Sequence, residues 1–144
     1  NFRGVGRSVR VHDEGRGELD DLRTVVAQCA AEGPLALAGF SFGSFVAAGA
    51  VPELAAARDL RSLVFVGTAV SRFAVLPLAP ELHERVLLVH GEQDDTVPLA
   101  DVMDWARPQN LPVTVMPGAS HFFHGQLTAL RGVVLRHLRA TCGS

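Results

Sequence analysis

The sequence predicts an α/β protein with a mostly parallel sheet and helices on both faces. Short apolar runs rich in Val, Leu and Phe alternate with longer stretches whose apolar residues recur every three or four positions. Runs of nearly continuous hydrophobicity are typical of parallel strands buried on both faces, and the alternation of strand and helix favours right-handed crossovers. No repeat, low-complexity tract or linker divides the 144 residues, so we expect one domain.

The first expected helix begins near Leu19 or Asp20, with acidic residues in its first turn, and ends before Gly33 and Pro34. We expect it to cover one face of the sheet. Its apolar stripe has helical spacing and consists of Leu22, Val25, Val26, Cys29 and Ala30.

Four strands and three further helices are expected after it. The expected strands are residues 35–38, 62–67, 86–90 and 113–116. The expected helices are residues 42–56, 99–106 and 127–139. Each strand is therefore followed by a turn or loop on the same edge of a parallel sheet, which is where ligands bind in open α/β folds.

Composition excludes several classes of protein. A formal net charge of -2 and scattered arginines give no footprint for nucleic acid, and no apolar run approaches the length of a membrane span. With 48% hydrophobic and 19% charged residues, the chain is globular rather than disordered. The two cysteines, Cys29 and Cys142, make a disulfide framework improbable and favour the cytoplasm.

The pentapeptide Gly39-Phe40-Ser41-Phe42-Gly43 lies between an expected strand and an expected helix. A serine in a G-x-S-x-G turn of this kind is exposed on a strained backbone, and the flanking glycines leave room for the turn to close. Ser41 is therefore the candidate nucleophile. The alternative is a glycine-rich turn that contains a serine by chance.

Candidate partners for Ser41 follow two later strands. Asp94 and Asp95 come after the strand at residues 86–90, and His121 comes after the strand at residues 113–116. A serine nucleophile needs a base and a carboxylate that orients it, and the chain order Ser, Asp, His suits the strand-to-helix elbow. Separately, each acid could cap a helix or turn and His121 could be a surface residue; His90 is more readily explained as a packed residue.

These motifs together resemble the α/β-hydrolase superfamily, in particular small bacterial serine hydrolases without a lid. Residues 39–43 look like the family's elbow, residues 90–98 like its acid loop, and residues 118–123 like its histidine loop. The resemblance extends to residues 1–8, which look like the loop after the fourth strand, whereas residues 9–11 depart from the family pattern. Gly91, Asp94, Val97 and Pro98 match the pattern G-x-x-D-x-x-V-P, which selects Asp94 over Asp95.

The resemblance implies a serine hydrolase of the carboxylesterase type (EC 3.1.1) that acts on a small acyl substrate through an acyl-enzyme, with no cofactor and no metal. Ser41 would attack, His121 would transfer the proton, Asp94 would orient His121, and the backbone amide of Phe42 would stabilise the oxyanion. Peptidase or acyltransferase activity with the same triad is an alternative. A second alternative is a non-enzymatic interaction module on a hydrolase scaffold.

The chain opens with Asn1 and no methionine stands near its start, so we expect it to be a piece of a longer chain. The resemblance implies that part of the fold precedes Asn1. The family's third strand and second oxyanion donor would lie there. We therefore expect an uncovered sheet edge that favours self-association, and poor activity of this segment alone although its full-length parent is active.

Phe40, Phe122 and Phe123 flank the nucleophile or follow the base, so they are candidate walls of an apolar substrate pocket. Ordinary core packing explains each of them equally well. The stretch at residues 70–85 leaves little room for a lid, which favours small or accessible substrates.

Overall fold

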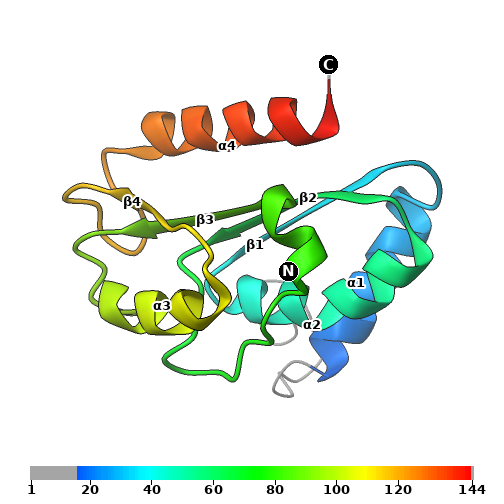
Figure 1. Cartoon of the computed structure of the whole chain (residues 1–144), viewed down its shortest axis with the longest axis horizontal. Coiled ribbons are helices and arrows are strands. Elements are labelled where there is room, and N and C mark those ends of the chain that lie inside the picture. The colour runs from blue at the N-terminus through cyan, green and yellow to red at the C-terminus, as the bar shows by residue number, and fades with distance from the viewer. Residues whose placement is uncertain (1–15, 144) are drawn as a thin grey trace.

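A four-stranded parallel sheet with the strand order β1-β2-β3-β4 organises the chain (Figure 1). The computed structural model describes residues 16–143. The strands are β1 (Leu35–Phe40), β2 (Leu60–Val66), β3 (Val86–Gly91) and β4 (Thr114–Met116). All four predicted strands are present, with boundaries that differ by no more than two residues, and the predicted parallel α/β class is confirmed.

Helices cover both faces of this sheet. They are α1 (Arg16–Cys29), α2 (Phe42–Ala57), α3 (Leu99–Ala106) and α4 (Leu127–Cys142), with two short 3₁₀ helices, η1 (Pro80–Arg85) and η2 (Arg107–Gln109). Figure 1 shows α4 on one side of the sheet and α1, α2 and α3 on the other. The three later α-helices lie where the sequence predicted them.

Alternate side chains of β2 supply the two halves of the core. Leu63 and Phe65 join the large cluster on the side of α2, whereas Val64 and Val66 join a smaller cluster beneath α4. All four are buried, so β2 has the two-sided burial that its continuous apolar run predicted.

β1 does not have the predicted burial on both faces. Leu35 and Leu37 are buried toward α2, but Ala36 and Ala38 are exposed. The reason is coverage: among residues 16–143, α4 packs on β2 rather than on β1, and the outer face of β1 is left exposed. An apolar sequence makes a strand compatible with burial on both faces. The strand is buried on both faces only when another element covers each of them.

α1 also departs from the prediction. It begins three residues earlier than expected, at Arg16, and it packs on α2. Leu22, Val26 and Ala30 contact the core, but Val25 and Cys29 of the predicted stripe are exposed. A helix that rests on another helix buries a narrower stripe than one that lies flat on a sheet, so the wider stripe was wrong.

The motifs proposed within residues 1–11 lie outside the described residues.

Candidate active site

Ser41 occupies a sharp turn between β1 and α2. Its backbone has φ 55° and ψ -118°, a conformation that non-glycine residues rarely adopt, and its amide donates a hydrogen bond of 2.8 Å to the carbonyl of Val66. A Cβ on Gly39 would stand 2.5 Å from the carbonyl oxygen of Gly43, so the turn closes only with glycine at position 39. The hydroxyl of Ser44 fixes the same turn by donating to the carbonyl of Gly39 at 2.9 Å.

Asp94 lies in the turn after β3, and its side chain is fully buried. Its Oδ1 accepts the backbone N–H groups of Thr96 and Val97 at 2.9 and 2.7 Å. Its Oδ2 lies 2.6 Å from Nδ1 of His121. The neighbouring Asp95 is exposed, so the structure places Asp94, not Asp95, beside the histidine.

His121 follows β4 and joins the other two residues into one hydrogen-bonded chain. Its Nε2 is 3.0 Å from Oγ of Ser41, and its ring is almost completely buried. Because the Asp94 carboxylate only accepts, Nδ1 carries the proton and Nε2 is left to accept from the serine hydroxyl. Gly67, with φ +60°, leaves the space for this ring, since a Cβ there would stand 3.1 Å from Cε1 of His121.

The loops that carry Asp94 and His121 are tied to each other. The amide of Glu92 donates to the carbonyl of Met116 at 3.0 Å, and the amide of Gln93 donates to the carbonyl of Ala119 at 2.9 Å. The carboxylate of Glu92 accepts from the amide of Gly118 at 3.0 Å. These bonds join the loop after β3 to the loop after β4. The distance between the two loops is therefore fixed by more than the Asp94–His121 contact.

The three phenylalanines predicted to wall a pocket lie around one apolar groove of about 270 Å³. Phe40 and Phe122 are 41% and 59% exposed, whereas Phe123 is 1% exposed and belongs to the core cluster beneath α4. Phe40 connects the groove to the site, because its ring centroid is 5.1 Å from that of His121. Val66, Leu127 and Leu130 complete the lining.

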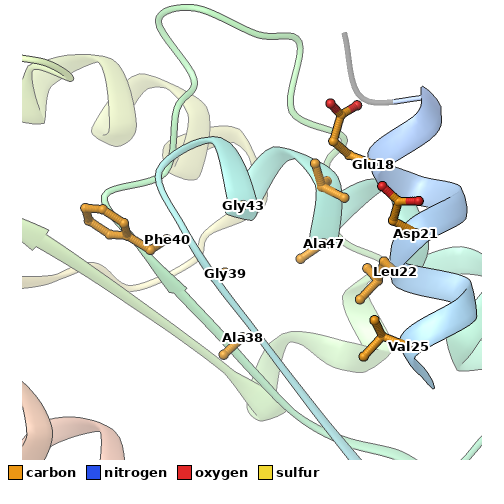
Figure 2. Close-up of a pocket in the computed structure, with 10 residues that line it drawn as sticks. Glu18, Asp21, Leu22, Val25, Ala38, Gly39, Phe40, Gly43 and Ala47 are labelled. Carbon is orange, nitrogen blue, oxygen red and sulfur yellow. The ribbon is translucent and has the colours of Figure 1, made fainter. Parts of the chain in front are cut away.

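A larger cavity of about 460 Å³ lies along β1 on the side of α1 (Figure 2). Figure 2 shows Glu18 and Asp21 of α1 on one wall, with Gly39 and Phe40 of β1 opposite. Ser41, His121 and Asp94 line neither the cavity nor the groove. Phe40 lines both, Gly39 and Gly43 beside Ser41 line the cavity, and Phe122 beside His121 lines the groove.

An aromatic cluster beside the nucleophile turn was missed by the sequence analysis. The ring of Phe73 lies 4.9 Å from that of Phe42 and 4.8 Å from that of Phe45, measured between centroids. Phe42 and Phe45 are three residues apart at the start of α2, which is a signal for a shared helix face. Phe73 lies in the irregular segment between β2 and η1, and nothing in its local sequence points to Phe42.

Within residues 16–143, no group of three or more His, Cys, Asp or Glu residues is arranged to hold a metal ion. None of the helices in this part of the chain combines the length and the apolar character needed to cross a membrane.

A parallel α/β sheet, with a serine on a strained strand-to-helix turn and an aspartate and a histidine after later strands, defines the architectural class of the α/β hydrolases. The solved structures similar to this chain belong to that class. A lid-less α/β serine hydrolase from Xanthomonas campestris is 34% identical, with a TM-score of 0.81 over 97% of this chain. An α/β serine hydrolase homologue from Coxiella burnetii is 36% identical, with a TM-score of 0.77 over 96% of this chain.

The chain belongs to the α/β-hydrolase superfamily. It spans 64% of the length of the Xanthomonas protein and 66% of that of the Coxiella protein. No protein-family model and no curated protein sequence matches it.

Proposed function

We propose that this chain carries the catalytic residues of a serine hydrolase that cleaves carboxylic esters or related acyl compounds through an acyl-enzyme. One observation carries the proposal: Oγ of Ser41 lies 3.0 Å from Nε2 of His121, and Nδ1 of the same ring lies 2.6 Å from the buried Asp94. A nucleophile, a base and an orienting carboxylate in hydrogen-bond contact form the arrangement that activates a serine hydroxyl.

The proposed reaction has two halves. In the first, Nε2 of His121 takes the proton of Ser41 while Oγ attacks the carbonyl carbon, and the imidazolium then gives that proton to the departing alcohol. In the second, His121 removes a proton from water, the resulting hydroxide attacks the acyl carbon, and Ser41 leaves with the proton restored. Asp94 keeps Nδ1 protonated throughout, so that Nε2 faces the serine.

We assign one oxyanion donor to the backbone N–H of Phe42, the first residue of α2 and the residue after the nucleophile. The α2 N-terminus adds a favourable dipole at the same position. Removing one donor from an oxyanion hole typically slows turnover by about 10²- to 10³-fold. If the second donor lies outside this chain, as the resemblance implies, the chain alone hydrolyses esters more slowly than the whole protein by about that factor.

We assign the acyl chain of the substrate to the groove between Phe40 and Phe122. The groove is apolar and it begins at the ring that packs on His121, so an alkyl chain attached to the reacting carbonyl has an apolar surface within reach. Burying each methylene there contributes about 0.8 kcal/mol. A preference for butyrate or hexanoate esters over acetate follows.

The test uses a fluorophosphonate probe, which reacts with an activated serine, followed by hydrolysis of p-nitrophenyl esters. We expect covalent labelling of the chain that Ser41→Ala abolishes and that Ser71→Ala, a change at an exposed serine, leaves intact. Labelling that survives Ser41→Ala, or no labelling of the folded wild-type chain, contradicts the proposal and favours a non-enzymatic module.

Self-association through β1 stays a prediction. In residues 16–143 β1 pairs only with β2, so its other edge is without a strand partner in this part of the chain. Unpaired edges favour contact between chains, and sedimentation of the purified chain at several concentrations measures it. Cytoplasmic location also stays a prediction.

A further inference from the structure

His90 is a buried titratable side chain that the reaction described above does not use. It is the fifth residue of β3, four positions before Asp94, and it is 1% exposed. Its Nε2 lies 2.7 Å from the carbonyl oxygen of Val97 and 3.3 Å from Oδ2 of Asp94. The sequence suggested a packed histidine, and the structure places it against the carboxylate that orients His121.

The contact with Val97 decides where the proton of His90 lies. A carbonyl oxygen only accepts, so Nε2 is the protonated nitrogen. The other nitrogen, Nδ1, is buried and has no hydrogen-bond partner among the described residues. The Nε2–H therefore donates to the carbonyl of Val97, and Oδ2 of Asp94 lies 3.3 Å from the same nitrogen.

This N–H lies beside the Asp94 carboxylate, while its hydrogen bond goes to the carbonyl of Val97. Oδ1 has two backbone donors, the amides of Thr96 and Val97. Among the described residues, Oδ2 is bonded to His121 at 2.6 Å and has a longer contact with His90 at 3.3 Å. The N–H of His90 holds the carbonyl of Val97, whose amide donates to Oδ1 of Asp94, so His90 ties the turn that contains the acid to β3.

We propose that His90 is a positioning residue that holds the turn at residues 94–97, and through it the Asp94 carboxylate and the ring of His121, by means of the bond from its Nε2–H to the carbonyl of Val97. The inference rests on the proposed function, because positioning matters only if the Asp94–His121 pair activates Ser41. Without the N–H, the turn at residues 94–97 loses its bond to β3, and the carboxylate that this turn holds can shift. Small displacements of a catalytic group cost up to about 10²-fold in rate.

Three variants separate positioning from packing. His90→Leu removes the donor at similar volume, and His90→Gln retains an amide N–H near the place of Nε2. Val89→Ala is the matched control: Val89 is as buried as His90 and lies next to it on β3, but it packs in the cluster beneath α4. The measurement is fluorophosphonate labelling of Ser41 in the whole chain, resolved into the probe's binding constant and its maximal rate, at a temperature where every variant is folded.

We expect His90→Leu to lower the maximal labelling rate by about 10- to 10²-fold with unchanged probe binding. His90→Gln should stay within about threefold of wild type, and Val89→Ala should lower the melting temperature without changing the rate. A wild-type rate in His90→Leu, or equal losses in His90→Leu and His90→Gln, overturns the proposal. If His90→Leu does not fold, His90→Asn takes its place in the comparison, because the shorter amide of asparagine does not reach the place of Nε2. Equal maximal labelling rates for His90→Asn and His90→Gln would then overturn the proposal.

A proton NMR signal distinguishes failure of this inference from failure of the proposed function. The Nδ1–H of His121 in its 2.6 Å bond to Asp94 should resonate far downfield. We expect this signal in the wild type and in His90→Gln, and its broadening or upfield shift in His90→Leu. If Ser41 does not react with the probe at all, the proposed function fails while this signal still tests His90. An identical signal in His90→Leu overturns the positioning role.

Discussion

The two sides of Ser41 are built differently. Toward β3 and β4, Asp94 and His121 are buried in loops that exchange backbone and side-chain hydrogen bonds. Toward the outer face of β1, Ala36 and Ala38 are exposed and Phe40 forms an open apolar wall. On the side of β3 and β4, the positions of Asp94 and His121 are fixed by hydrogen bonds. On the side of β1, the apolar residues are exposed to solvent.

The difference follows from the position of each strand in the sheet. β3 has a neighbour on each side, and the loops leaving β3 and β4 lie at the same edge, so their backbones bond to one another. β1 is an edge strand in the described part of the chain and has no such second loop beside it. Fixed geometry therefore arises where the loops of two neighbouring strands bond to each other, and access arises along the face of β1 that is exposed among residues 16–143.

The largest expected effect on labelling comes from a substitution of Asp94, on the side of the site where hydrogen bonds fix the loops. Asp94→Asn should reduce fluorophosphonate labelling by about 10⁴-fold with the fold retained, because the amide cannot accept from both His121 and the two backbone amides, and the wrong tautomer of His121 results. Labelling kinetics and circular dichroism measure it. Asp95→Asn, at the exposed neighbour, is the control and should have no effect. A loss below tenfold in Asp94→Asn would mean that the buried carboxylate does not orient the base.

Gly91→Ala should separate the two loops of the fixed side. A Cβ at position 91 would stand 2.4 Å from the carbonyl oxygen of Ala119 and 2.8 Å from that of Ser120, and both are backbone atoms that move only with the histidine loop. We expect a loss of about 1–3 kcal/mol in the free energy of unfolding, measured by urea denaturation, together with slower labelling.

Gly49→Ala in α2 is the control for Gly91→Ala. An added Cβ at position 49 meets nothing within 4 Å, so this change should be neutral or stabilise the helix by about 0.5–1 kcal/mol. Equal stability of Gly91→Ala and wild type would show that the loops are not as close as the structure places them.

Phe122→Ala should change the preference between acyl chains and leave the hydrogen-bonded residues Ser41, His121 and Asp94 in place. Shortening the exposed wall of the groove should lower the rate for p-nitrophenyl hexanoate relative to acetate by about tenfold, because apolar contact with the longer chain is lost. Leu76→Ala removes an exposed apolar side chain outside the groove and should leave the ratio unchanged. If the two variants give the same ratio, the acyl chain does not lie between Phe40 and Phe122.

Glu92→Ala should have the smallest effect. It removes the solvent-exposed bond between the carboxylate and the amide of Gly118, while the two backbone bonds between the loops remain. We expect a loss of about 1 kcal/mol or less in thermal unfolding and at most a few-fold change in labelling. Glu81→Ala in η1 is the matched exposed control; a larger effect of Glu92→Ala would show that this bond holds the histidine loop in place.

The sequence by itself determined the order of strands and helices and the turn at Ser41. Periodicity and turn chemistry are local properties, so β2, β3 and α3 were found within two residues of their true bounds. It also placed Ser41, Asp94 and His121 on one edge of a parallel sheet, where the structure brings them within hydrogen-bond distance. The choice of Asp94 over Asp95 needed a family pattern, because both are short acids in the same turn.

Only the tertiary structure decided which apolar residues are covered and what the buried polar groups contact. Ala36, Val25 and Cys29 follow patterns of buried residues but are exposed, because burial requires a second element at the right place. Phe73 reaches Phe42 from an irregular segment after β2, and His90 comes beside Asp94 because the turn after β3 folds back on the strand. The first contact depends on where distant backbone lies in space and the second on the shape of the turn, and no periodic sequence pattern encodes either.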